Sequence, residues 1–301
     1  MGLLNIMLPV FIIFTLGYIA HKKLKFDIKS ISSVSIYILS PCLAFRSFYS
    51  NPITLEYVYI ITGCLVMAGI LLLLALFASK LLKSSYSERS AIILSTVFMN
   101  SGNYGAPIIL FAYGETAFSY AVIILVLHSL LMNTLGIFFA ALGGKENYTT
   151  KEAISNVLHM PVIYTVFLAV TFNLLHIKVP EFITNGVYLL ADATIPIVML
   201  ILGMQLASIS IKKVKYLYVN IAVIIRMIIS PIIAAIVIHY FPISELAKLV
   251  FILQMAMPSA ANTTMYALRY DTEADLVAFT TFITTLLSII TVPITLSILG
   301  Y

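Results

Sequence analysis

Long apolar runs of about 20 residues, separated by short charged clusters, constrain this 301-residue chain more than any other feature. A helix needs about 20 apolar residues to cross the hydrocarbon core of a bilayer. Only 10% of the residues are charged, against roughly 25% in soluble domains. The pattern predicts an all-α polytopic membrane protein with ten transmembrane helices, at about 2–20, 29–48, 54–79, 88–112, 115–141, 152–175, 183–206, 214–240, 245–268 and 274–299.

Other classes of protein fit the sequence poorly. A transmembrane β-barrel would show alternating hydrophobicity in segments of about ten residues. Cys42 and Cys64 both lie in apolar runs, so we expect buried small side chains rather than a disulfide or a metal site. Residues 1–20 lack a basic start and a small-residue cleavage site, so we expect them to form the first span rather than a cleavable signal peptide.

Most of the 17 Lys and Arg residues follow odd-numbered spans, which places them on one side of the membrane. The positive-inside rule predicts that this side is cytoplasmic and that both termini lie outside. The sequence pI of about 9.0 then reflects membrane topology, and nucleic-acid binding is not needed to explain it. The residues on the predicted cytoplasmic side are Lys22, Lys23, Lys25, Lys29, Lys80, Lys83, Arg89, Lys145, Lys151, Lys212, Lys213, Lys215 and Arg269.

A polar loop at about 142–152 divides the chain into two parts with five expected spans each. The stretch SERSAIILSTVFMNSGNYG, from Ser87, aligns in register with SELAKLVFILQMAMPSAAN, from Ser244. Because five is odd, the second part must cross the membrane in the opposite sense. We therefore predict two five-helix repeats, 1–144 and 145–301, related by the inverted topology of many secondary transporters.

Polar and helix-breaking residues interrupt the fourth span of each repeat, as NSGNYGAP at 100–107 and MPSAANTT at 257–264. Unpaired backbone groups are tolerated at membrane depth only where protein or water surrounds them, and paired breaks point to a transporter's binding site. Two unwound segments would present helix N-termini, which favour an anion. Ordinary kinks with interhelical hydrogen bonds are the alternative. We expect breaks at Gly102, Gly105, Pro107 and Pro258, and substrate contacts from Asn100, Ser101, Asn103, Ser259, Asn262, Thr263 and Thr264.

Ionisable residues inside spans are costly and indicate function by default. Arg226, in the eighth span, is a candidate ligand for a substrate carboxylate, with a structural pair or a water-lined position as alternatives. Asp192, in the seventh span, could bind a cation or a proton, although a structural pair with Arg46 or Arg226 is favoured. His128, in the fifth span, could titrate near neutral pH, although a neutral His bonded to a neighbouring helix is favoured.

The two interrupted segments also resemble a known family. NSGNYGAP at 100–107, MPSA at 257–260 and ALRY at 267–270 resemble motifs of the auxin efflux carrier family of membrane transport proteins, whose bacterial members include predicted malate and malonate permeases. The resemblance covers the whole chain. It implies a fold like that of the bile acid–sodium symporters, with a scaffold of spans 1, 2, 6 and 7. Spans 3–5 and 8–10 would form a mobile transport core in which spans 4 and 9 cross.

The chain differs from the plant PIN carriers of this family. Those carriers have N-P-N-T-Y at both crossings and a long central hydrophilic loop, and this chain has neither. An auxin-like indole acid is therefore disfavoured as the substrate, and a carboxylate such as malate or malonate is favoured.

These features together predict a secondary transporter that moves a small organic anion across the cytoplasmic membrane by alternating access. Sodium or proton coupling and a homodimer through the scaffold are compatible with the sequence, and no cofactor is expected. A channel-like anion pathway is the alternative. An intramembrane enzyme is disfavoured, because Asp192 is the only acid deep in a span and no H-E-x-x-H motif is present.

Overall fold

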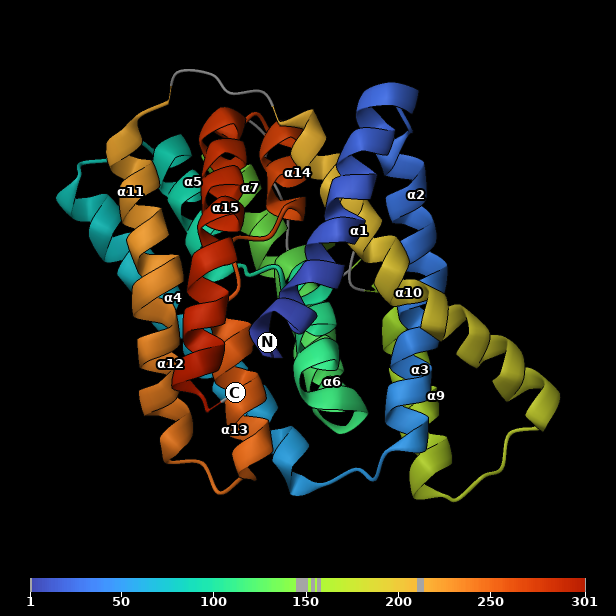
Figure 1. The fold of residues 1–301 in the computed structure, drawn as a ribbon. Helices are drawn as coiled ribbons and strands as arrows, with labels where there is room; N and C mark the ends of the chain where they lie inside the picture. Colours follow the sequence, from blue (N-terminus) through green and yellow to red (C-terminus); the bar gives the residue numbers. More distant parts are fainter. Residues whose placement is uncertain (1, 145–150, 153–154, 156–157, 210–213, 301) are drawn as a thin grey trace.

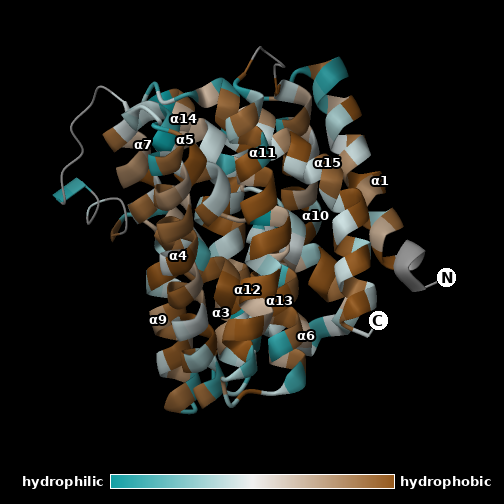
Figure 2. Ribbon diagram, turned by 90° about the vertical axis from the view of Figure 1, so that its left-hand side faces the viewer, coloured by the Kyte–Doolittle hydropathy of each residue, from teal (hydrophilic) through white to brown (hydrophobic). Residues whose placement is uncertain are grey.

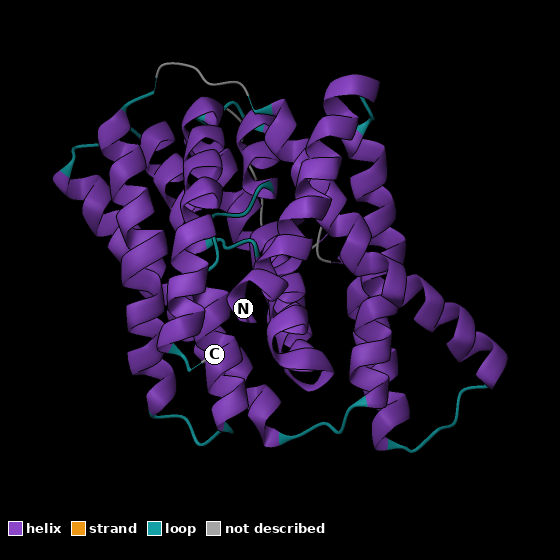
Figure 3. Cartoon of the chain, viewed as in Figure 1, coloured by secondary structure: helices purple, strands orange, loops and turns teal. Residues whose placement is uncertain are grey.

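The computed structural model describes residues 2–144, 151–152, 155, 158–209 and 214–300. Much of the expected central loop, including residue 145 of the predicted repeat boundary, lies outside the described residues. The described part of the chain is almost entirely helical (Figure 3). In chain order its helices, with π-helical turns labelled η, are α1 (Gly2–Leu24), α2 (Ile28–Val34), η1 (Ser35–Leu39), α3 (Ser40–Ser50), α4 (Leu55–Leu81), α5 (Tyr86–Val97), η2 (Ser101–Gly105), α6 (Ala106–Leu131), η3 (Met132–Gly136), α7 (Ile137–Gly143), α9 (Pro161–Leu174), α10 (Glu181–Ser208), α11 (Tyr216–Ile224), η4 (Ile225–Ile229), α12 (Ser230–His239), α13 (Glu245–Met255), α14 (Asn262–Arg269) and α15 (Ala274–Ile298).

Seven helical stretches of the described residues are long and apolar enough to cross a membrane, and Pro161–Leu174 is apolar but shorter. Apolar residues cover much of the helix flanks, and hydrophilic residues gather toward the two ends (Figure 2). These observations confirm an all-α polytopic membrane protein. The count of ten crossings in two inverted repeats stays a prediction. The seven stretches are Ile6–Leu24, Ile28–Ser50, Leu55–Leu81, Ser101–Gly143, Glu181–Ser208, Tyr216–His239 and Ala274–Ile298.

The number of long helices falls below ten partly because the expected fourth and ninth spans are broken. Their first parts, α5 and α13, are each too short to cross a bilayer alone. The second part of the fourth span runs on into the expected fifth as the stretch Ser101–Gly143. Within that stretch Gly114 has φ 77° and ψ −169°, a backbone conformation that glycine reaches without a steric penalty. The helix therefore breaks where the boundary between spans 88–112 and 115–141 is predicted.

Three of the four π-helical turns in the described residues end just before a proline, namely Pro41, Pro107 and Pro231. Proline has no N–H, and its ring clashes with the carbonyl four residues earlier. In a π turn a carbonyl bonds the N–H five residues on, and such turns occur frequently at functional sites. The widened π turns relieve the clash between the proline ring and the earlier carbonyl, and the chain stays helical.

The helices pack in two groups (Figure 1). In the first, α1 packs along α10, and α3 packs against α9 and α10; we call α1, α2, η1, α3, α9 and α10 the α10 group. In the second, α5 contacts α4, α7, α11 and α15; we call α4–α7, η2–η4 and α11–α15 the α5 group. The α10 group contains the helices expected in the scaffold, and the α5 group contains those expected in the core. Motion of one group against the other stays a prediction.

The contact between α1 and α10 depends on two glycines. A Cβ atom at Gly17 would lie 2.3 Å from the Leu200 carbonyl oxygen, and one at Gly203 would lie 2.0 Å from the Phe14 carbonyl oxygen. Small residues allow membrane helices to approach closely enough for backbone contact. The two glycines therefore allow the backbones of α1 and α10 to lie in direct contact.

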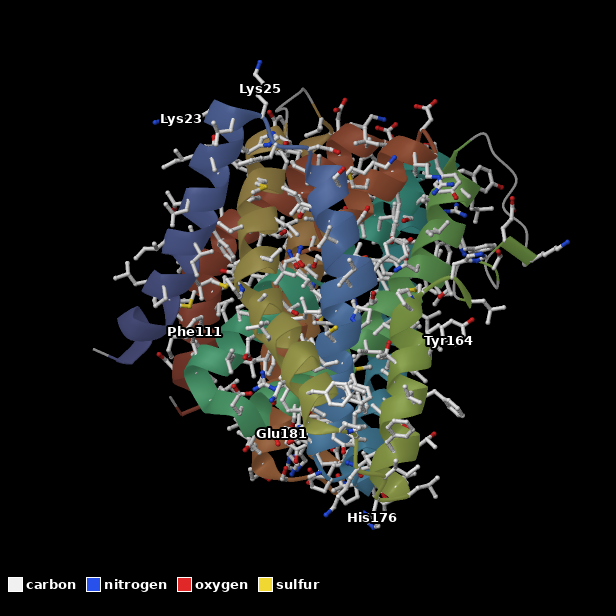
Figure 4. All side chains as sticks on the ribbon, turned by 90° about the vertical axis from the view of Figure 1, so that its right-hand side faces the viewer. Lys23, Lys25, Phe111, Tyr164, His176 and Glu181 are labelled. Carbon is white, nitrogen blue, oxygen red and sulfur yellow. The ribbon has the colours of Figure 1, made fainter. Side chains whose placement is uncertain are left out.

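Polar side chains mark the two ends of the molecule. Lys23 and Lys25 project from one end, and His176 lies at the other (Figure 4). Asp27, between α1 and α2 at the lysine-rich end, accepts a hydrogen bond from the Lys29 N–H at 3.1 Å and caps α2. The arrangement is compatible with the predicted topology, and the assignment of the lysine-rich end to the cytoplasm stays a prediction.

Candidate functional site

The two interrupted segments meet inside the molecule. The Asn100 N–H donates to the Pro258 carbonyl at 2.8 Å, and the Ala260 N–H donates to the Phe98 carbonyl at 2.9 Å. These bonds form an isolated antiparallel bridge between Met99 and Ser259. Figure 3 shows the corresponding loop stretches between the helices, away from both ends of the molecule. We call residues 98–100 and 258–260 the crossing. Backbone groups that the breaks free from helical bonding are thus paired with each other.

Side chains of neighbouring helices support the crossing. The Ser259 hydroxyl donates to the Ser95 carbonyl at 2.6 Å, and the Ser259 N–H donates to the Thr284 hydroxyl at 3.2 Å. The Met99 N–H donates to Nε2 of the buried His128 at 2.9 Å. An Nε2 that accepts a hydrogen bond carries no proton, so this His is neutral with its proton on Nδ1. The favoured interpretation of His128, a neutral side chain bonded to a neighbouring segment, agrees with this geometry.

Arg226 holds the ends of the two helices that lead into the crossing. Its side chain is fully buried and donates to the Thr96 carbonyl, near the end of α5, at 3.1 Å. It also donates to the Met255 carbonyl, at the end of α13, and to the Ser230 hydroxyl at 2.7 Å. A cation at helix C-termini is favourable, because unpaired carbonyls give those ends partial negative charge. These bonds fit a structural role for Arg226, and its expected role as a substrate ligand stays a prediction.

A cavity of about 90 Å³ lies between the two helix groups, beside the crossing. The α10 group lines it with η1, α3 and α10, and the α5 group lines it with the crossing, η2, α6, η3 and the start of α14. We call it the crossing cavity. Its described lining residues include no Lys, Arg, Asp or Glu. They are Ser35, Ile36, Ser40, Leu43, Met99, Asn100, Ser101, Gly102, Asn103, Leu125, Ser129, Met132, Thr194, Ile195, Val198, Ala260, Ala261 and Asn262.

Several expected site residues line this cavity, and others do not. Asn100, Ser101, Gly102, Asn103 and Asn262 are among the lining residues. The Asn100 Nδ2 atom is buried and has no hydrogen-bond partner, which leaves a donor beside the cavity. These residues come from both interrupted segments, and their role in substrate binding stays a prediction.

The remaining expected ligands do not line the crossing cavity. Ser259 is fully buried within the crossing, and the Thr263 hydroxyl donates to the Ala260 carbonyl at 2.7 Å. Thr264 lines a different cavity, and Arg226 lines neither of them. The side chains of Ser259, Thr263 and Arg226 therefore bond to backbone groups of the crossing or its flanks.

The expected helix breaks have distinct geometries. Pro258 contributes its carbonyl to the crossing, and Pro107 follows η2. At Gly105 a Cβ atom would lie 2.4 Å from Gln254 Oε1, so only glycine fits there without moving that side chain. Gly102 has more space, since its nearest neighbour, a Leu125 methyl carbon, would lie 3.3 Å away from an added Cβ.

The α10 group contributes polar residues that are not predicted from the sequence. Ser35, Ser40 and Thr194 line the crossing cavity, and the Gln205 Nε2 donates to Asn262 Oδ1 at 3.1 Å. Two of them carry a recognisable sequence pattern, namely a small polar residue close to a proline within an apolar helix. Ser40 directly precedes Pro41, and Thr194 lies two residues before Pro196.

Asp192 pairs with Arg46 within the α10 group. Arg46 also lies 3.8 Å from Glu115 of α6, so it contacts both helix groups. The three residues line a cavity of about 300 Å³, which shares Leu43 and Ile195 with the crossing cavity. Of the two structural partners considered for Asp192, the geometry selects Arg46.

A multi-pass helical membrane protein with two broken helices that meet beside a cavity has the architecture of a membrane transporter. Comparison with known families agrees: residues 3–296 match the model of a family described as "Membrane transport protein", and the chain belongs to that family. The resemblance to the auxin efflux carrier family is thereby confirmed.

Two curated relatives are both named as uncharacterized transporters. The one from Methanocaldococcus jannaschii is 26% identical over 273 residues, covering 88% of this chain and 87% of the relative. The one from Methanothermobacter thermautotrophicus is 24% identical over 303 residues, covering 98% and 97%. The similarity therefore extends over nearly the full length of each protein.

Proposed function

We propose that this protein is a secondary transporter of a small organic anion, with the substrate bound in the crossing cavity. The single observation that carries the proposal is the crossing itself, where two interrupted segments bond to each other beside a cavity to which both contribute asparagine side chains. Broken helices that meet near the midplane form the substrate sites of many transporters.

An anion is favoured by the donors around the cavity. Ser101 begins the helical run that continues into α6, and the first N–H groups of a helical run have no partner within it. Those N–H groups, together with the helix dipole, favour negative charge. The Asn100 Nδ2 donor has no partner, and Ser101 and Asn103 add polar groups from the same segment. The modest size of the cavity supports a small carboxylate such as malate or malonate over an indole acid.

Transport would proceed by movement of the α5 group against the α10 group. Two polar contacts that join the groups must break and re-form: the bond from Gln205 to Asn262, and the contact of Arg46 with Glu115. The crossing would travel with the α5 group as one unit, because Ser95, His128 and Thr284 all belong to that group. Coupling of this movement to sodium or to protons, and a homodimer through the α10 group, are both compatible with the mechanism.

The test is uptake into proteoliposomes. The purified protein is supplied with labelled malate, malonate, other dicarboxylates and an indole acid, with and without sodium and pH gradients. We expect saturable uptake of a dicarboxylate and counterflow from preloaded vesicles. Flux that rises linearly with concentration, without counterflow, would instead support a channel.

Two variants connect the flux to the cavity. Asn103→Leu and Asn262→Leu should abolish uptake, because each replaces a cavity amide with an apolar side chain. Asn220→Leu, at an exposed position on α11, is the matched control and should transport normally. Membrane insertion should be equal in all three. Undiminished uptake by both cavity variants would rule out the crossing cavity as the substrate site.

A further inference from the structure

A second cavity lies beside the first, between α10, α14 and α15. Its volume is about 240 Å³. It shares Ala261 with the crossing cavity, and Gln205, which bonds to Asn262 of the crossing cavity, is among its lining residues. We call it the Gln205 cavity. Its lining residues are Gln205, Leu206, Ser208, Ile209, Ala261, Thr264, Met265, Leu268, Ala274, Asp275, Ala278 and Thr281.

Three side-chain oxygens of residues that line the Gln205 cavity are buried without a hydrogen-bond partner. They are Gln205 Oε1, Thr264 Oγ1 and Thr281 Oγ1. Thr281 has no exposed surface. A buried polar group without a partner is unfavourable, and in native proteins such a group usually satisfies a ligand, an ion or an ordered water. The oxygens come from three different helices, so the cavity gathers unsatisfied groups from both helix groups.

The chemistry of this set favours a cation. An amide oxygen can only accept a hydrogen bond or coordinate a positive ion, and both hydroxyl oxygens can do the same. Asp275 adds a carboxylate to the lining, and the described lining residues include no Lys, Arg or His. Within the part of the chain that the structure describes, no group of three or more His, Cys, Asp or Glu residues is placed to hold a metal ion. Calcium sites generally use several carboxylates, so the set suits a single positive charge better than a double one.

We propose that the Gln205 cavity is a binding site for a monovalent cation. Gln205 Oε1, Thr264 Oγ1 and Thr281 Oγ1 are the neutral oxygen ligands, and the Asp275 carboxylate lies in the same lining. This assignment needs no knowledge of what the crossing cavity binds.

Gln205 gives the cation site a physical connection to the crossing cavity. Its Nε2 atom donates to Asn262 Oδ1, while its Oε1 atom belongs to the cation site. A bound cation would hold the amide in the orientation that bonds Asn262, and so would favour the arrangement of the two helix groups seen here. This consequence rests on the proposed function, whereas the binding of the cation does not.

The experiment measures ion-dependent thermal stability of the full-length protein in detergent. Melting curves are recorded in NaCl, KCl and choline chloride at equal ionic strength. A ligand that binds the folded state raises the melting temperature with increasing concentration. We expect a saturable rise of several degrees in NaCl or KCl over choline chloride. Equal melting temperatures in all three salts would overturn the proposal.

Single substitutions in the cavity lining test whether the ion-dependent rise in melting temperature comes from this site. Thr264→Val and Thr281→Val keep the side-chain shape and remove one oxygen each, and Asp275→Asn removes the charge. We expect each to abolish the ion-dependent rise or to shift it to at least tenfold higher ion concentration. Thr285→Val, on the next turn of α15, is the matched control, because the Thr285 hydroxyl already bonds the Thr281 carbonyl at 2.7 Å and lies outside the cavity lining.

The same variants separate an ion site from a merely structural role. In choline chloride, Thr281→Val should melt at or above the wild-type temperature, since it removes an oxygen that has no partner. An ion-dependent rise that persists unchanged in both Thr264→Val and Thr281→Val would show that the ion binds elsewhere on the protein, and would overturn the assignment to this cavity. Failure of the cation site would appear in these melting curves, and failure of the proposed function would appear in the uptake of the Asn103 and Asn262 variants.

Discussion

A single arginine, Arg226, bonds the two helices that lead into the crossing. Arg226 bonds carbonyls near the ends of both α5 and α13, and its planar group of donors suits several acceptors at fixed positions. The sequence indicates that Arg226 is buried and important, but it does not indicate which groups surround it. Both carbonyls are separated from Arg226 by many residues along the chain, so only the folded arrangement reveals them.

Replacing Arg226 tests whether it acts on the fold or on the substrate. Arg226→Met leaves the Thr96 carbonyl without its side-chain donor, whereas the Met255 carbonyl keeps the Ser230 hydroxyl at 2.9 Å. An unsatisfied buried group costs about 1–3 kcal/mol, so we expect a clear fall in melting temperature. Arg269→Met, at an exposed position on α14, is the control and should melt like the wild type. Normal stability with complete loss of uptake would instead assign Arg226 to the substrate.

The exposed cap of α2 predicts a local pH dependence. Hydrogen bonds from the Ser30 hydroxyl and from the Lys29 N–H hold the pKa of the Asp27 carboxyl below its ordinary value. A carboxyl with a lowered folded-state pKa stabilises the folded state above its unfolded pKa, about 4, and that contribution is lost as the pH falls through the folded pKa. Asp27→Asn should therefore flatten the acid side of a plot of melting temperature against pH. A wild-type acid slope in that variant would contradict the prediction.

At the scale of helices, the sequence predicts where the chain breaks better than what the breaks touch. The segments at 100–107 and 257–264 are recognisable because glycine, proline and amides interrupt apolar runs. The turn at Gly114 also falls at an expected boundary. The contributions of Ser35, Thr194 and Gln205 were not predicted, because they depend on how the α10 group rotates and slides against the crossing. A single sequence does not fix that relative placement.

The approach of α1 to α10 gives a prediction at the same scale. Gly203→Ala would place a methyl group 2.0 Å from the Phe14 carbonyl oxygen, so the two helices must move apart. We expect a lower melting temperature and weaker uptake, because close packing drives helix association in a membrane. Gly186→Ala is on the same helix, where an added Cβ meets nothing within 4 Å, and should be neutral or slightly stabilising. Equal behaviour of the two variants would argue against a tight contact.

At the scale of the whole molecule, the class and the family are readable from the sequence, and the relation between the two helix groups is not. Apolar runs and lysine clusters establish a membrane protein because the bilayer imposes lengths and charge preferences on any chain that crosses it. The bilayer imposes no comparable constraint on the position of the α5 group relative to the α10 group. It depends on contacts such as that of Arg46 with Glu115, which join residues far apart in the sequence.

Cross-linking tests whether the two groups move. In a protein with Cys42 and Cys64 replaced, the pair Arg46→Cys and Glu115→Cys links the α10 group to the α5 group. The pair Arg46→Cys and Asp192→Cys links two helices of the α10 group alone. A short thiol-specific cross-linker should arrest uptake in the first protein and spare it in the second. Arrest in both, or in neither, would contradict movement between the groups.

The bridge between Met99 and Ser259 also sets an order of events during biosynthesis. The ribosome delivers Phe98 and Asn100 long before it delivers Pro258 and Ala260, whose backbone groups pair with them. In the interval the earlier segment has a carbonyl and an N–H without partners, which is costly at membrane depth. The site is therefore among the last parts of the protein to mature. In a nascent chain arrested before residue 258, the Phe98 carbonyl and the Asn100 N–H lack these partners, and the insertion machinery must keep them away from lipid.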